Sequence, residues 1–114
     1  MSVQLNGWDE VRVSVEQLVE NCPDPFDANT VANVGDLLAA CATGTPVPTS
    51  VGKGYWESVC FSWSNFQIEV FEDRLEVYRF FDQRSEIWYE EHQPGAAFTS
   101  RLLAELAALT HLKA

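Results

Sequence analysis

The stretch that decides the fold covers residues 59–91 and reads VCFSWSNFQIEVFEDRLEVYRFFDQRSEIWYEE. Apolar and polar side chains alternate in four short runs that are rich in aromatic and β-branched residues, a pattern typical of strands. The expected turns at residues 64–65, 72–74 and 82–85 are short, so successive strands should pair antiparallel. The sequence therefore predicts a four-stranded β-meander over about residues 56–91.

The same alternation predicts two faces for this sheet. The apolar set expected to face the core comprises Phe61, Trp63, Phe66, Ile68, Val70, Leu75, Val77, Ile87 and Tyr89. Aromatic rings and carboxylates are expected together on the opposite face, at Glu69, Phe71, Glu76, Tyr78, Phe80, Glu86, Trp88 and Glu90, beside Cys60, Ser62 and Gln67. Aromatic residues amid charge are common at protein interfaces, so these eight residues are the predicted partner-binding site.

Three helices are predicted outside the sheet, over residues 8–21, 27–43 and 96–112, where apolar residues recur three or four apart. Pro23 and Pro25 should end the first helix, Gly44 the second, and Pro94-Gly95 should separate the sheet from the third. Residues 45–54 are expected to form an extended connector. The predicted class is α+β in the order α-α-β-β-β-β-α, with helices packed on one face of the sheet.

Length and composition indicate one globular domain over residues 1–114. A chain of 114 residues with 46% hydrophobic and 21% charged residues is large enough to fold without a metal or a disulfide. No apolar run reaches the roughly 18 residues of a membrane span. The first six residues lack the basic and apolar regions of a signal peptide, so the expected location is the cytoplasm.

The charge balance narrows the choice of partners. Seventeen acidic residues against seven basic ones give a net charge of −10, which disfavours direct binding to nucleic acids and to anionic membranes. The acidity is explained either by solubility or by a basic protein partner whose capture it would speed.

Sites for metals and cofactors are not predicted. Zinc sites need Cys or His pairs a few residues apart, whereas the three cysteines are nineteen residues apart and the two histidines are isolated. The odd cysteine count also argues against a disulfide framework. The segment Gly52-Lys53-Gly54 lacks the full spacing of a phosphate-binding loop.

The sequence also argues against an enzyme. His92 and His111 are the candidate general bases, but no nucleophile or cofactor motif accompanies them. Glu69 and Glu76 are expected to face each other across adjacent strands, where water would leave them ordinary acids.

The leading hypothesis is a non-enzymatic module whose acidic and aromatic sheet face covers a basic, nucleic-acid-binding surface of another protein. The segments 61–63, 68–73 and 76–80 resemble small bacterial and phage-associated proteins without an assigned activity, so the specific form is an inhibitor from a phage or mobile element. The alternatives are an antitoxin or immunity protein for a basic toxin, a self-associating accessory protein, and a small-ligand binder or minor enzyme. The expected state is either a monomer or a homodimer formed through the open face, and the N-terminal segment, the connector or a second copy could cover that face.

Overall fold

The computed structural model describes residues 7–23, 25–42, 44–54 and 57–109. Its elements, in chain order, are α1 (Trp8–Asn21), α2 (Ala28–Cys41), β1 (Ser50–Lys53), β2 (Val59–Trp63), β3 (Phe66–Val70), β4 (Arg74–Phe80), β5 (Ser85–Glu91) and α3 (Ser100–Ala108). The predicted α+β class with an antiparallel sheet is confirmed. The sheet has five strands rather than four, in the spatial order β1-β2-β3-β4-β5.

The additional strand comes from the segment predicted to be a connector. Residues 50–53 pair antiparallel with β2, with Ser50 opposite Ser62 and Lys53 opposite Val59. The indole of Trp63 donates a hydrogen bond of 2.8 Å to the carbonyl of Pro46, and Trp8 makes a similar bond to Thr45. These bonds hold the connector beside α1 and at the β1 edge, so it does not cover the open face.

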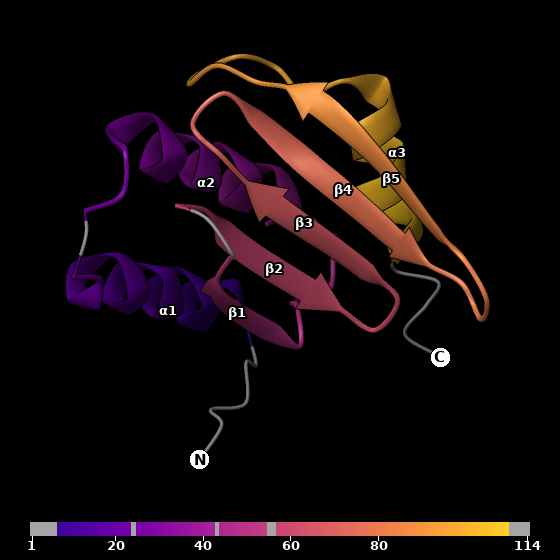
Figure 1. The fold of residues 1–114 in the computed structure, drawn as a ribbon, viewed down its shortest axis with the longest axis horizontal. Helices are drawn as coiled ribbons and strands as arrows, with labels where there is room; N and C mark the ends of the chain where they lie inside the picture. Colours follow the sequence, from indigo (N-terminus) through magenta and orange to yellow (C-terminus); the bar gives the residue numbers. More distant parts are fainter. Residues whose placement is uncertain (1–6, 24, 43, 55–56, 110–114) are drawn as a thin grey trace.

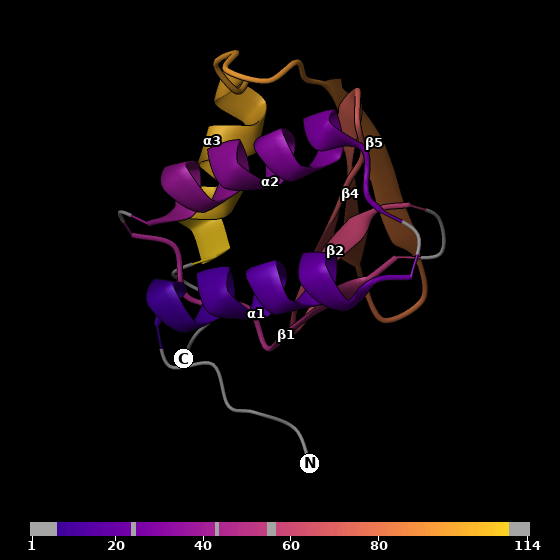
Figure 2. The same cartoon turned by 90° about the vertical axis from the view of Figure 1, so that its left-hand side faces the viewer.

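The three helices lie on one side of the sheet (Figure 1 and Figure 2). α1 contacts β1, α2 contacts β3, and α3 lies behind β4 and β5. The core between helices and sheet is formed by fully buried side chains from both layers, including Val11, Val34, Leu37, Phe61, Ile68, Val77 and Leu102. Inward positions predicted for β2, β3 and β4 are confirmed, because every apolar residue expected to face the core from these strands is buried.

Side-chain caps set where two of the helices begin. The Asp27 carboxylate accepts a hydrogen bond from the Asn29 amide, so α2 starts at Ala28. α3 starts at Ser100 rather than at residue 96, because the Thr99 hydroxyl accepts from the Leu102 amide and caps the helix there. The predicted end of this helix, at residues 110–112, lies outside the described residues.

Candidate functional site: the open face of the sheet

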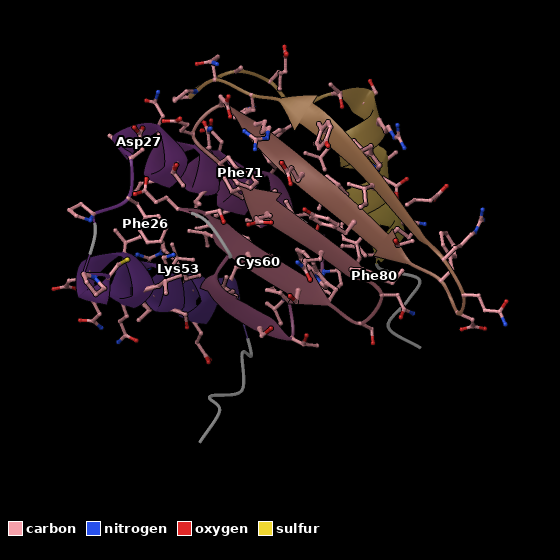
Figure 3. The ribbon with its side chains drawn as sticks, in the orientation of Figure 1. Phe26, Asp27, Lys53, Cys60, Phe71 and Phe80 are labelled. Atoms are coloured by element: carbon pink, nitrogen blue, oxygen red, sulfur yellow. The ribbon has the colours of Figure 1, made fainter. Side chains whose placement is uncertain are left out.

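The open face is built from two rows of side chains that cross the five strands. Strand register puts each row at one level of the sheet. One row consists of Gly52, Cys60, Glu69, Glu76 and Tyr89, and the next of Ser50, Ser62, Gln67, Tyr78 and Ile87. In Figure 3 this face is turned toward the viewer, with Cys60, Phe71 and Phe80 labelled on it.

The predicted facing of β5 is wrong. Val77, which points to the core, lies opposite Trp88, whereas Tyr78 on the open face lies opposite Ile87. The cause is the hairpin, in which the Phe81 amide bonds to the Arg84 carbonyl at 2.8 Å and leaves a two-residue turn between them. This turn makes even-numbered residues of β5 oppose odd-numbered residues of β4. Glu86, Trp88 and Glu90 therefore lie on the helix side, and Ile87 and Tyr89 lie on the open face.

Two of the three residues that lie on the helix side instead of the open face contact α3 or its N-cap. Trp88 packs against the core, with the Arg101 guanidinium 4.1 Å from its ring centre. Glu90 is buried and accepts hydrogen bonds from the Thr99 amide, at 3.0 Å, and from the Thr99 hydroxyl. Glu86 lies opposite Arg79, which pairs with Glu105 of α3. Glu90 in particular joins β5 to the start of α3.

Glu69 and Glu76 face each other across β3 and β4, as predicted. They are not open to water to the extent expected, because Glu69 is buried and accepts a hydrogen bond from the Ser58 hydroxyl. A side chain at Gly54 would force the Ser58 hydroxyl and the Glu69 carboxylate to move. Each carboxylate oxygen of Glu76 accepts one bond, from Arg74 Nε at 2.9 Å and from the Tyr78 hydroxyl at 2.8 Å.

The pKa values of a thiol and a phenol beside these carboxylates, those of Cys60 and Tyr78, are raised. Burial raises the pKa of the Cys60 thiol, and the negative charge of Glu69 raises it further. Burial also raises the pKa of Tyr78, and its hydrogen bond to Glu76 adds to the effect. A thiol and a phenol with raised pKa values are poor nucleophiles at neutral pH. The middle of the open face is therefore a network of internally bonded polar groups.

Apolar side chains are exposed where the open face meets the β4–β5 hairpin. Tyr78 and Phe80 stack with ring centres 6.4 Å apart and planes within 6°. Phe80, Ile87 and Tyr89 expose 42%, 55% and 68% of their surface. We call Tyr78, Phe80, Ile87 and Tyr89 the β4–β5 patch. Two of its members were predicted to bind a partner, and the other two come from the reversed facing of β5.

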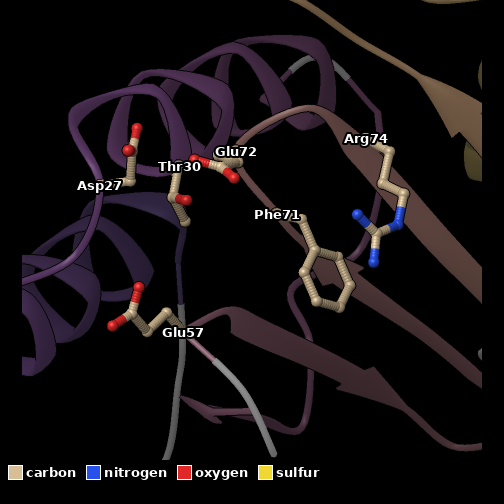
Figure 4. Close-up of a pocket in the computed structure, with 6 residues that line it drawn as sticks. All are labelled: Asp27, Thr30, Glu57, Phe71, Glu72 and Arg74. Atoms are coloured by element: carbon tan, nitrogen blue, oxygen red, sulfur yellow. The ribbon is translucent and has the colours of Figure 1, made fainter.

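Phe71 and the acidic turn beside it form a separate region at the other end of β4. Phe71 is only 8% exposed, and the Arg74 guanidinium lies 4.1 Å from its ring centre. A pocket of about 410 Å³ opens here between the start of α2 and the β3–β4 turn (Figure 4). Sequence reasoning missed it because its lining residues are up to 47 positions apart, from Asp27 to Arg74.

His92, a candidate general base, is buried where α2 contacts the segment between β5 and α3. It is 2% exposed, its Nε2 lies 2.8 Å from Asp36 Oδ2, and its ring stacks on Phe98. The Gly95 amide donates to the same Asp36 oxygen, and the Asn33 amide bonds to the His92 carbonyl. These bonds join α2 to the segment between β5 and α3. His111 lies outside the described residues.

Within residues 7–109, leaving out 24, 43 and 55–56, no three His, Cys, Asp or Glu side chains are arranged to hold a metal ion. The described helices include none with the length and apolar character needed to cross a bilayer. Comparison of the chain with protein-family models, with curated proteins and with solved structures gave no match.

Proposed function

We propose that this chain is a non-enzymatic module that binds a basic protein through the β4–β5 patch. The observation that carries the proposal is the exposure of Ile87 and Tyr89 on the face opposite the helices. Monomeric proteins seldom leave contiguous large apolar side chains in water without a use for them.

The shape of the patch supports protein binding. Its four side chains stand on two paired strands, β4 and β5, which hold them in fixed relative positions. Tyrosine and phenylalanine supply large contact areas with few rotatable bonds, and tyrosine is often among the residues that dominate affinity. The patch is therefore suited to form the dry centre of an interface, with polar groups of Glu76 and Gln67 beside it.

The charge of the chain supports a basic partner. Seventeen acidic and seven basic residues leave an excess of ten carboxylates even if every basic residue is paired within the chain. Both arginines of β4 are already paired within the chain, since Arg74 bonds to Asp73 and Glu76, and Arg79 bonds to Glu105. A positive surface would be attracted at long range and steered into contact.

The specific form of this proposal is an inhibitor, from a phage or mobile element, that occludes a nucleic-acid-binding surface. An antitoxin or immunity protein would bind a basic toxin in the same way. A toxin gene adjacent to the gene for this chain would favour the antitoxin.

The test is capture of a partner from a lysate of the organism that encodes the chain. We expect the wild-type protein to retain a basic protein that is released by salt and by competing DNA. The double variant Ile87→Glu and Tyr89→Glu should lose it. A matched control, Val13→Glu with Leu103→Glu, introduces the same charges at exposed apolar positions of α1 and α3 and should retain it. Retention by the patch variant, or capture insensitive to salt and DNA, would contradict the proposal.

Self-association is a second candidate, favoured by the position of β5. This seven-residue strand is an edge of the sheet, and it carries the two most exposed members of the patch. An exposed edge strand offers unpaired backbone groups to another strand. A second copy would then bury the patch, and the solution mass distinguishes this case from binding to a different protein.

A further inference from the structure

The pocket beside the start of α2 is lined by three carboxylates, an aromatic ring, a hydroxyl and an arginine. It is lined by Asp27, Thr30, Glu57, Phe71, Glu72 and Arg74, which come from α2, its cap, the segment before β2 and the β3–β4 turn. Figure 4 shows the three carboxylate side chains around the opening, with Phe71 and Thr30 beside it. The pocket is thus acidic at its rim and has an aromatic ring in its wall.

The negative charge of this pocket is not balanced by its arginine. Arg74 Nη1 lies 2.8 Å from Asp73, and its Nε lies 2.9 Å from Glu76, so two other carboxylates already neutralise it. The pKa of Glu72 is raised because its carboxyl group hydrogen-bonds to Asp27 and is repelled by its charge, with smaller contributions from Asp73 and Glu57. Crowded carboxylates of this kind are stabilised when a cation is bound between them.

A buried hydroxyl in the pocket wall gives a second, independent indication. Thr30 is 0% exposed, and its Oγ1 has no hydrogen-bond partner among the described residues. An unsatisfied buried hydroxyl costs free energy, and groups of this type are commonly completed by a ligand or a water molecule. Thr30 Oγ1 is a good acceptor for an N–H donor that enters the pocket between the carboxylates.

We infer that this pocket receives an arginine side chain of the basic partner, an inference that rests on the proposed function. A guanidinium presents five N–H donors in a plane, enough to bond to more than one carboxylate and to a hydroxyl at once, while its stem lies along Phe71. The carboxylate rim disfavours an anion. A metal ion is disfavoured because the described residues offer no set of three suitable ligands.

The test is an NMR titration of the full chain with Nα-acetyl-arginine amide. We expect saturable shifts of the backbone amides of Thr30, Phe71 and Glu72. The amide of Nα-acetyl-citrulline has nearly the same shape without the charge and should cause no saturable shift. Equal shifts with citrulline, or equal affinity for Nα-acetyl-lysine amide, would overturn the assignment to arginine.

Two variants examine the groups that carry the inference. Glu72→Gln should weaken arginine binding about tenfold, because it removes a charge-assisted hydrogen bond. Thr30→Val should weaken binding severalfold without lowering the melting temperature, since its hydroxyl has no described partner to lose. The matched control Glu86→Gln removes an exposed carboxylate from β5 and should leave affinity unchanged. Equal weakening by Glu72→Gln and Glu86→Gln would mean that only the net charge matters, and would overturn the inference.

The outcome can be separated from that of the proposed function. The Ile87→Glu and Tyr89→Glu variant should bind the arginine probe normally, because neither residue lines the pocket. Suppose that Glu72→Gln and Thr30→Val still capture the partner and that the arginine probe causes no saturable shifts. These results together would overturn this inference alone. Titration by the probe with no loss of capture in the patch variant would overturn only the assignment of the β4–β5 patch.

Discussion

Trp88 and Tyr89 are neighbours on β5, but they lie on opposite faces of the sheet and in different surroundings. Trp88 packs against the core and lies beneath Arg101 of α3, whereas 68% of the Tyr89 surface is exposed. Each face also holds a buried carboxylate, since Glu90 on the helix side and Glu69 on the open face are both buried and hydrogen-bonded. Both residues are aromatic, so hydrophobicity does not explain the difference. Trp88 stabilises the fold because a helix covers it, whereas Tyr89 is left available to a partner.

The largest difference in stability is expected between variants of these two neighbouring residues. Trp88→Ala should lower the free energy of unfolding by about 2 kcal/mol, somewhat less than for a fully buried tryptophan, because contacts with the core and Arg101 are lost. Tyr89→Ala should change it by less than about 0.5 kcal/mol. Urea unfolding of both variants measures the difference. Equal costs, or a larger cost for Tyr89→Ala, would mean that β5 faces the other way.

A smaller effect is expected where β5 meets α3. Glu90→Gln keeps the size of the side chain but removes its charge, and should cost about 1.5 kcal/mol because the bonds to Thr99 weaken. Hydrogen exchange of the amides in the first turn of α3 should become faster. Glu86→Gln is the matched control on the same strand and should change neither quantity. If amide exchange in the first turn of α3 is unchanged in Glu90→Gln, Glu90 does not stabilise the start of this helix.

The smallest stability effect is expected at the contact between α2 and the β5–α3 segment. Burial alone would raise the pKa of Asp36, but the hydrogen bonds from His92 and from the Gly95 amide together outweigh it and lower the pKa. The folded state therefore binds this proton less tightly than the unfolded chain. The stabilisation is complete above the ordinary value of 3.8 and is lost as the pH falls through the lower folded pKa.

Asp36→Asn checks this pH dependence. The variant should be about 1 kcal/mol less stable than the wild type at pH 6, and the difference should shrink below pH 4 as the wild-type carboxylate becomes protonated. Urea unfolding from pH 3 to pH 7 provides the measurement. A difference that stays constant over this range would mean that the Asp36 charge does not stabilise the fold.

The helices and the central strands could be predicted from the sequence because their apolar patterns have one clear side. α1 begins and ends where expected, and Phe61, Ile68 and Val77 face the core as predicted. β1 could not be predicted, since the four residues Ser50–Lys53 contain a glycine and only one large apolar side chain. Its place depends on pairing with β2 and on hydrogen bonds from two tryptophans.

The candidate site was predicted less well than the fold, for a physical reason in β5. Ile87, Trp88 and Tyr89 are consecutive, so either face of this strand satisfies an apolar pattern, and only the two-residue turn of the hairpin decides between them. Phe80 and Tyr78 were placed correctly on the open face. The acidic pocket could not be predicted at all, because it depends on how α2 packs beside the β3–β4 turn.

Whether the β4–β5 patch is free is decided by the solution mass of the wild type and of the Ile87→Glu and Tyr89→Glu variant, measured by light scattering at low and high salt. If the β4–β5 patch is free for a basic partner, both proteins have the mass of a 12.8 kDa monomer at either salt concentration. A wild type of twice that mass, which the variant returns to a monomer, would show that the patch serves self-association. That result would contradict the account.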